Sequence, residues 1–208
     1  LNPEFTRFQI KVRPGIYWSD GVEFTVEDIA FTIRMLVNTK ELPTSAYWAR
    51  ILKPDMKVVD KYTLEVQTAS SYPRLQQVLG TTIASNSFRV VAKHIWEKQD
   101  PTKFENYPPV TISPYVLKSH DPNGQWFLYE RRADWQRTDT AMVAGEPKPK
   151  FVLYRFWGPE EKRILAAIQN DLDVMMDITP ESWDILKDKN KSAQAWLKTF
   201  PYAAFDDP

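Results

Sequence analysis

The chain contains no cysteine among its 208 residues. Without thiols it can form neither a disulfide framework nor a thiolate zinc site, and it has no cysteine nucleophile. Basic and acidic side chains number 27 each, so the formal net charge is zero. A neutral chain lacks the broad positive field of a non-specific nucleic-acid or anionic-membrane binder, and we therefore expect no nucleic-acid partner.

Glycine is scarce as well, with 6 residues against 16 prolines. Few glycines leave few flexible loops that could cradle a phosphate, and neither G-x-G-x-x-G nor G-x-x-x-x-G-K-[ST] occurs. These absences argue against an ordinary dinucleotide or P-loop enzyme, and we expect no cofactor. No apolar run approaches the length of a membrane-spanning helix, and the first residues show no signal-peptide pattern.

What the chain has in quantity is aromatic residues within an otherwise ordinary globular composition. Apolar residues make up 43% and charged residues 26%, which excludes global disorder. Large flat rings fill hydrophobic cores well, and they also provide stacking surfaces for ligands. The eight tryptophans are spread over the whole chain: Trp18, Trp48, Trp96, Trp126, Trp135, Trp157, Trp183 and Trp196.

The pattern of apolar and polar residues predicts strands and helices mixed along the whole chain. Strands are predicted at residues 8–13, 56–59, 62–66, 115–118, 125–131, 151–157 and 173–177. Helices are predicted after Thr25, from Pro73, over residues 90–98, after Gly158 and after Thr179. Such mixing is typical of an α/β or mixed α+β fold.

Local signals sharpen this outline. Thr25 is a good N-cap, and Asp28 three residues later completes a capping-box pattern. The sequence D-P-N-G at residues 121–124 is a strong turn signal between two strands. Residues 42–54 are predicted to be a proline-bounded loop, and residues 138–149 a polar, flexible segment. Four prolines between residues 101 and 114 place a domain boundary after residue 112.

Residues 8–32 strongly resemble the signature of the family 5 extracellular solute-binding proteins. The family pattern is a strand ending in L-R-P-G, then W-S-D-G, then F-T-A-E-D-V at a helix start. Here the matching residues read V-R-P-G, W-S-D-G and F-T-V-E-D-I. Residues 58–64, 93–97, 113–117, 130–135 and 166–174 fit later family segments in the same order, although Ala92, Thr111 and Ser113 replace a proline and two glycines.

The resemblance implies a receptor of an ABC importer with a periplasmic-binding-protein-like fold, not an enzyme. Members bind oligopeptides, dipeptides, nickel or oligosaccharides between two lobes and deliver them to a membrane permease. Residues 1–112 would form the accessory subdomain of the first lobe and residues 113–208 part of its core, with the second lobe absent from this piece. We expect a monomer that is periplasmic or extracellular, with a lipoprotein tether as one option.

The best candidates for ligand contact are two aromatic residues and two polar ones. Tyr47 and Trp48 fall in the loop that the family places near the cleft, although the indole could instead fold back onto the subdomain. Ser85 and Asn86, in a polar segment, could bond a ligand or cap the loop, and capping is the more common role.

Other chemistry finds little support in the sequence. Asp20 could be read as catalytic, but a turn beside a buried ring explains it better. Asp171, Asp173 and Asp177 lack the glycine and glutamate of a calcium loop, and His94 and His120 form no metal pair. We therefore predict no catalytic and no metal-binding residue.

For the ligand, the number of tryptophans and the runs at residues 93–97 and 123–127 resemble the oligosaccharide-binding branch of the family, which implies an oligosaccharide, and ring stacking on sugar C–H faces gives this a physical basis. An oligopeptide is the nearest alternative, because peptide receptors also use backbone pairing and roomy side-chain pockets. A carbohydrate hydrolase is a remote third reading, since no nucleophile or acid–base motif stands out.

Overall fold

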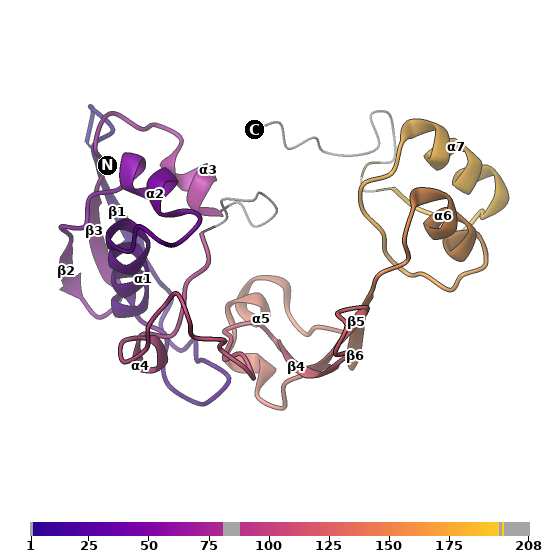
Figure 1. Cartoon of the computed structure of the whole chain (residues 1–208), viewed down its shortest axis with the longest axis horizontal. Helices are drawn as coiled ribbons and strands as arrows, with labels where there is room; N and C mark the ends of the chain where they lie inside the picture. The colour runs from indigo at the N-terminus through magenta and orange to yellow at the C-terminus, as the bar shows by residue number, and fades with distance from the viewer. Residues whose placement is uncertain (1, 81–87, 196, 198–208) are drawn as a thin grey trace. The chain divides into compact units, whose positions relative to one another are not determined.

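The computed structural model describes residues 2–80, 88–195 and 197 (Figure 1). The chain divides into two compact units, Leu1–Leu153 and Tyr154–Pro208. Strands and helices are mixed along the described residues, and most of the predicted elements are present, with the exceptions given below. The mixed α/β class predicted from the sequence is therefore confirmed.

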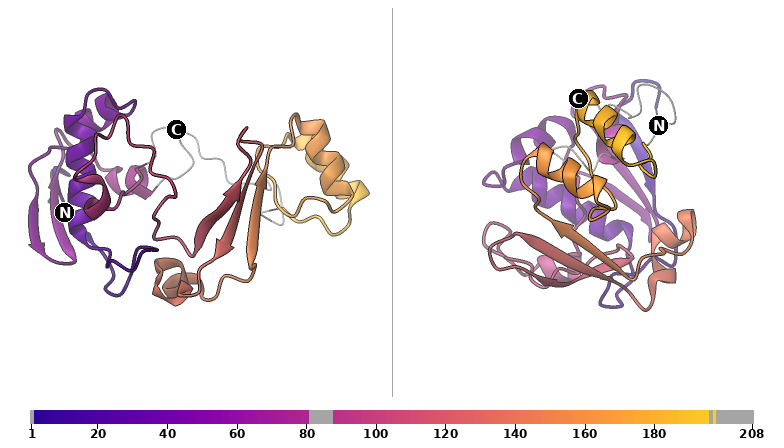
Figure 2. Two further views of the ribbon diagram at one scale, coloured as in Figure 1. Left: turned by 60° about the horizontal axis from the view of Figure 1, so that its bottom comes forward. Right: turned by 90° about the vertical axis from the view of Figure 1, so that its right-hand side faces the viewer.

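The first unit begins with a three-stranded antiparallel sheet. Its strands are β1 (Arg7–Lys11), β2 (Lys57–Asp60) and β3 (Thr63–Gln67), in the order β1-β3-β2. Leu64 and Val66 of β3 are fully buried while Glu65 between them is exposed, so one face of the sheet packs on a core. In Figures 1 and 2, helix α1 (Val26–Asn38) lies along that sheet.

Helix α1 starts where the sequence predicts and for the predicted reason. The Thr25 hydroxyl accepts a hydrogen bond from the Glu27 amide, and the Asp28 carboxylate accepts one from the Thr25 amide. This capping box satisfies amides that the first turn would otherwise leave unpaired. Its inward face then buries Val26, Ile29 and other residues in the core of the unit.

The prediction that residues 42–54 form a loop is wrong for the middle of this segment. It contains helix α2 (Ser45–Ile51), which buries Ser45, Trp48 and Ile51 on one side. These residues are three positions apart, which places them on one face of a helix. The prolines of the segment lie before and after the helix and not within it. Two further helices, α3 (Leu75–Gly80) and α4 (Lys93–Trp96), complete this half of the unit.

A second three-stranded sheet follows within residues 115–155. Strands β4 (Tyr115–His120), β5 (Trp126–Arg131) and β6 (Phe151–Arg155) lie in the order β4-β5-β6. The predicted turn joins β4 to β5, with the Gly124 amide donating to the Asp121 carbonyl at 2.9 Å and Gly124 at a φ of 71°. A short 3-10 helix (Trp135–Arg137) and helix α5 (Asp139–Ala144) lie between β5 and β6.

Helix α5 falls within the segment predicted to be flexible, and this too is a correction. The Thr138 side chain accepts a hydrogen bond from the Ala141 amide, which caps the helix, and Thr138 itself is fully buried. The expected boundary at residue 112 separates the two sheets, whereas the division into compact units comes after Leu153. The assignment of residues 1–112 and 113–208 to subdomains of a larger receptor stays a prediction.

The second unit is built on helices α6 (Glu160–Ile168) and α7 (Pro180–Lys189). Ile164, Ala167 and Leu186 form its small core. The strand predicted at residues 173–177 is wrong, because this stretch is irregular in the described structure. The Arg163 guanidinium binds the carbonyls of Met176 and Asp177, and Asp177 has a left-handed φ of 57°, which no strand residue adopts.

Candidate ligand-binding region

Trp48 lies at the centre of an aromatic cluster rather than on a loop. Its ring meets Tyr47 edge-to-face, with centroids 5.2 Å apart, and meets Phe88 in the same manner at 5.3 Å. Trp48 is fully buried, and its indole N–H has no hydrogen-bond partner within the described part of the chain. A fully buried indole offers no face to a ligand in this conformation, so the packing alternative fits Trp48 better.

Tyr47 is the half-buried member of this pair. Loss of hydration and a hydrogen bond with Tyr72 raise the pKa of the Tyr47 phenol above its ordinary value of 10.0. The phenol is therefore neutral at physiological pH and able to donate a hydrogen bond. Ser85 and Asn86 lie outside the described residues, so the structure brings together only the two aromatic members of the predicted set.

The W-S-D-G motif forms a tight turn, as the sequence predicts. The Gly21 amide donates to the Trp18 carbonyl at 3.0 Å, and Gly21 has a φ of 89°. Trp18 is 2% exposed and packs edge-to-face on Phe24 at 5.7 Å. The Asp20 carboxylate accepts from the Val22 amide, a bond that closes the turn and requires no catalytic role.

Sequence reasoning missed one partner of this turn. The Nε2 atom of His94, on α4, lies 2.7 Å from an Asp20 carboxylate oxygen, and both side chains are about one-third exposed. Each residue belongs to a motif that the family resemblance picked out, but nothing in the sequence links the two across 74 positions. The contact identifies His94 as part of a structural junction.

Two buried side chains of helix α1 accept hydrogen bonds from the segment that leads into α4. One Asp28 carboxylate oxygen accepts from the Lys93 amide at 2.9 Å, and the Thr32 hydroxyl accepts from the Val91 amide at 3.0 Å. Asp28 and Thr32 are both buried. Buried polar groups with full complements of partners are framework groups, and these two fix the start of α4 against α1.

The remaining histidine also has a structural setting. His120 stacks on Phe127 with ring centroids 5.9 Å apart and meets Tyr107 edge-to-face at 5.3 Å. Within residues 2–80, 88–195 and 197, no group of three His, Asp or Glu side chains is arranged to hold a metal ion. Over the same residues, no helix is long and apolar enough to cross a membrane.

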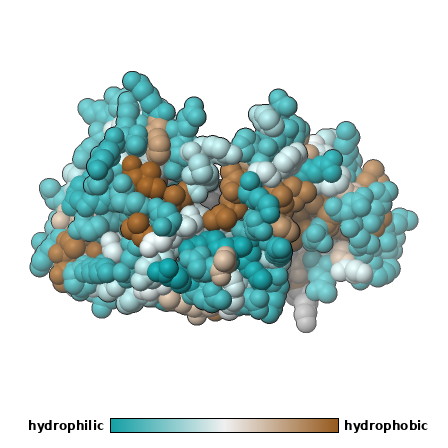
Figure 3. All heavy atoms as spheres, turned by 90° about the horizontal axis from the view of Figure 1, so that it is seen from below, coloured by the Kyte–Doolittle hydropathy of each residue, from teal (hydrophilic) through white to brown (hydrophobic). Residues whose placement is uncertain are grey.

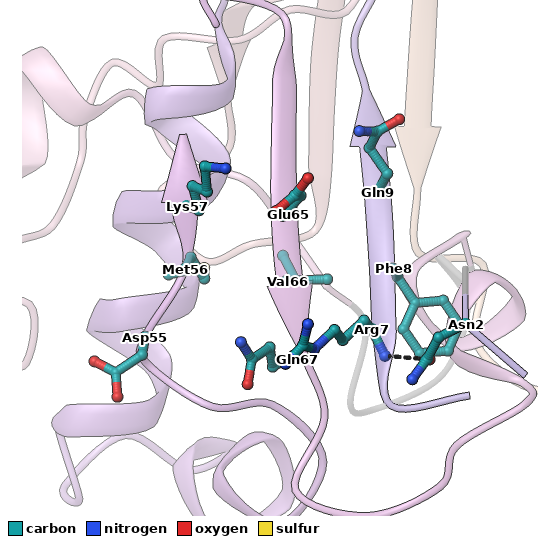
Figure 4. A pocket seen from close by; sticks show the side chains of 10 residues that line it. All are labelled: Asn2, Arg7, Phe8, Gln9, Asp55, Met56, Lys57, Glu65, Val66 and Gln67. Carbon is teal, nitrogen blue, oxygen red and sulfur yellow. Dashed lines mark hydrogen bonds between the residues drawn. The ribbon is translucent and has the colours of Figure 1, made fainter. Parts of the chain in front are cut away.

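A polar hollow of about 670 Å³ lies over the outer face of the first sheet (Figure 4). Glu65 stands in its middle, paired in register with Gln9 of β1 and Lys57 of β2. Charged and neutral polar side chains mix on this face, with Glu65 beside Lys57 and Arg7 beside Gln67, as on a solvated sheet face. Of the predicted contact residues that the structure describes, neither Tyr47 nor Trp48 lines it; the described lining residues are Asn2, Arg7, Phe8, Gln9, Asp55, Met56, Lys57, Glu65, Val66 and Gln67.

Hydrophobic side chains also reach the surface in places, as the brown spheres among the teal in Figure 3 show. In the first unit, Phe127, Phe151 and Leu153 are 38%, 43% and 57% exposed. The amino group of Lys118 lies 4.6 Å from the centre of the Phe151 ring and also pairs with Glu130, so this aromatic ring carries a cation on one side.

The comparisons with known proteins agree on one group. The family model of the bacterial extracellular solute-binding proteins, family 5, matches residues 2–205. A binding protein of Brucella melitensis is 23% identical over 190 residues, which cover 90% of this chain and 30% of that protein. The chain thus spans less than a third of the length of this curated relative.

Solved structures share the fold. The periplasmic oligopeptide-binding protein of Thermotoga maritima, solved with bound mannohexaose, matches 97% of this chain and 36% of its own, with a TM-score of 0.74 and 23% identity. Bacillus subtilis AppA, solved with a nonapeptide, matches 89% and 35%, with a TM-score of 0.68 and 16% identity.

Campylobacter jejuni NikZ, solved with Ni(L-His), matches 83% of this chain and 32% of its own, with a TM-score of 0.64 and 15% identity. At these identities the structural likeness shows the fold alone, whereas the family model spans nearly every residue. The W-S-D-G turn, the capped helix after it and the match over residues 2–205 lead to one conclusion. The chain belongs to the bacterial extracellular solute-binding proteins, family 5.

Proposed function

We propose that this chain is part of the substrate-binding component of an ABC-type importer, which captures an oligosaccharide between two lobes and delivers it to a membrane permease. The observation that carries the receptor role is the family match over residues 2–205. Receptors of this kind close over their ligands by hinge motion between lobes. The protein would then act outside the cytoplasmic membrane, as a monomer, without chemical turnover.

An oligosaccharide is the ligand class that we favour. One structural relative, the Thermotoga maritima protein, was solved with mannohexaose, and it matches 97% of this chain. Aromatic rings provide flat apolar faces on which the C–H face of a sugar can stack. Trp18 and Trp48 are buried and unsuited to this role, but Trp96, Trp126, Trp135, Trp157 and Trp183 are half-buried and retain accessible surface.

An oligopeptide is the second candidate. The Bacillus subtilis relative was solved with a nonapeptide, and the Thermotoga maritima protein is itself named as oligopeptide-binding. A carbohydrate hydrolase is disfavoured, because the family model that matches residues 2–205 describes solute-binding proteins. The Asp20–His94 pair closes a structural junction and lends a hydrolase no support.

We keep Tyr47, Trp48, Ser85 and Asn86 as the proposed contact region, with a division of roles. Tyr47 retains exposed surface and a neutral hydroxyl, so it can touch a ligand directly. Trp48 would act from beneath, since its ring supports Tyr47 at 5.2 Å. Ser85 and Asn86 are proposed from the sequence pattern.

The test is a thermal-shift screen of the protein expressed from its complete natural reading frame. Linear oligosaccharides of two to five units and short peptides serve as probes. We expect the Tm to rise with the sugars, because a ligand that binds only the folded state stabilises it. A rise with peptides alone would overturn the oligosaccharide assignment while leaving the receptor role in place.

A substitution at Tyr47 tests the proposed contact region separately. Replacing Tyr47→Ala should weaken binding of the best probe by about tenfold or more, since a ring contact and a hydroxyl are lost together. Tyr62→Ala is the matched control, because Tyr62 bonds Glu23 at 2.6 Å and belongs to no predicted contact set. Equal affinities for the Tyr47 and Tyr62 variants would remove Tyr47 from the site.

A further inference from the structure

Arg132 carries a guanidinium that is buried and completely engaged. The residue is 5% exposed and follows directly after strand β5. Its Nε and Nη2 atoms donate to the two carboxylate oxygens of Asp134, at 2.9 and 2.8 Å. The remaining hydrogen-bonding capacity goes entirely to main-chain carbonyls.

These carbonyls come from two distant stretches of the first unit. Nη1 donates to the Tyr17 carbonyl at 3.1 Å, and Nη2 donates to the Trp18 carbonyl at 3.2 Å. Longer contacts of 3.4 Å join Nη1 to the carbonyls of Thr111 and Ser113. One side chain thus reaches the turn that follows β1, the segment that precedes β4, and Asp134, two residues farther along the chain.

Main-chain bonds meet at the same junction. The Ser19 amide donates to the Thr111 carbonyl at 2.8 Å, and the Tyr17 amide donates to the carbonyl of Arg137 at 2.9 Å. The Arg137 guanidinium lies 3.4 Å from the centre of the Tyr17 ring. Residues 17–19 therefore contact the second sheet region through several bonds, and Arg132 binds the carbonyls of two of these three residues.

The chemistry explains why an arginine occupies this position. A buried cation is costly unless it is paired and hydrogen-bonded, and Asp134 supplies the charge while the carbonyls accept the remaining protons. Only the planar, five-donor guanidinium can bind a carboxylate with two parallel bonds and also reach several carbonyls. A lysine ammonium has three donors at one point and cannot span the same set.

We propose that Arg132 is a clamp that joins the first sheet, with its helices, to the second sheet, so that the two move as one body. It is a positioning residue and touches no ligand. The consequence is that any ligand-driven closure of the receptor has its hinge elsewhere than at this junction. The proposal rests on the contacts within residues 2–153 and does not depend on the ligand class.

The absence of native cysteine makes the test direct. Spin labels on Lys57→Cys in β2 and Asn123→Cys in the β4–β5 turn, both exposed, report the distance between the two sheets. Double electron–electron resonance should give one narrow distance distribution in the parent chain and a broader one in Arg132→Lys and Arg132→Met. In both variants the Tyr17 and Ser19 amides should exchange hydrogen at least about tenfold faster, while β3 amides keep their protection.

Arg131→Lys is the matched control. Arg131 is the adjacent residue and binds Glu146 and the Pro147 carbonyl, so it makes no contact between the sheets. It should keep the narrow distribution. A broad distribution in the parent chain, or a narrow one in both Arg132 variants, would overturn the clamp. Loss of β3 protection in Arg132→Lys would also overturn it, since Arg132 would then be needed to fold the sheet itself.

Discussion

Buried polar side chains hold the first unit together at a few defined points. Asp28 is the clearest case, because it is 4% exposed and its two carboxylate oxygens serve different elements. One accepts from the Thr25 amide at the start of α1, and the other accepts from the Lys93 amide at the start of α4. A single carboxylate therefore ties two helix starts together.

Replacing Asp28→Asn should lower the free energy of unfolding by about 2 kcal/mol, because an amide offers one acceptor oxygen for two buried N–H donors. Urea unfolding monitored by circular dichroism measures the loss. The control is Glu27→Gln, whose side chain is 44% exposed and whose pair with Lys93 contributes less than about 1 kcal/mol. Equal losses in the two variants would contradict this account of Asp28.

The Arg132–Asp134 pair makes a prediction about pH. The hydrogen bonds from Arg132 lower the pKa of Asp134 below its ordinary value of 3.8. A native pKa below the unfolded one means that the stabilisation is present above pH 3.8 and is lost as the pH falls through the native pKa.

We expect the Tm of the parent chain to fall more steeply than that of Asp134→Asn as the pH is lowered from about 5 to about 3. Calorimetric scans across this range measure the difference. The other carboxylates contribute equally to both proteins, so the difference between the two curves isolates Asp134. Parallel curves would show that the native pKa of Asp134 is not lowered.

The helices and turns that could be predicted from the sequence are those specified by local chemistry. The capping box of Thr25 and Asp28, the D-P-N-G turn and the Thr179–Pro180 start of α7 all appear where the residues indicate. Helix α2 could not be predicted from the local sequence, because its stability comes from burying Trp48 against α1 and Phe88. Such tertiary packing outweighs the flanking prolines, which by themselves indicate a loop.

The strand predicted at residues 173–177 is absent for a different reason, the lack of a strand to pair with among the described residues. Alternating acidic and apolar residues fit a strand, but a strand needs a neighbour, and the described residues of the second unit supply none. The backbone carbonyls there bind the Arg163 side chain instead. Periodicity indicates which face a strand would present, but it says nothing about a pairing partner.

The β4–β5 turn offers a test of local chemistry alone. Gly124 has a φ of 71°, and no atom of the described residues lies within 4 Å of the position that a Cβ would take. Gly124→Ala should therefore lower stability by about 1 kcal/mol through backbone strain and not through a clash. Gly80→Ala, which also has no described atom within 4 Å of its Cβ position and has no positive φ, should leave stability unchanged or raise it slightly. Thermal unfolding compares the two, and equal effects would contradict the argument.

The described residues form a sheet with four helices, a second sheet and a small helical unit, and the chain matches a solved structure of this fold over about a third of that protein's length. The family could be identified from the sequence because its motifs encode a specific local structure, the W-S-D-G turn and the capped helix. The candidate site could be predicted only in part. Trp48 was read as a loop residue, and the Asp20–His94 and Arg132 contacts join residues too far apart in sequence for any pattern to link.

Isothermal titration of the protein from its complete natural reading frame with a linear oligosaccharide, followed by mass spectrometry of the recovered sugar, tests the receptor proposal most directly. We predict saturable binding with a Kd of about 1 μM or tighter, equivalent to about −8 kcal/mol, and recovery of the sugar at its original mass. A sugar recovered as shorter fragments would identify an enzyme, and a protein that binds no sugar, no peptide and no nickel complex would contradict the receptor role.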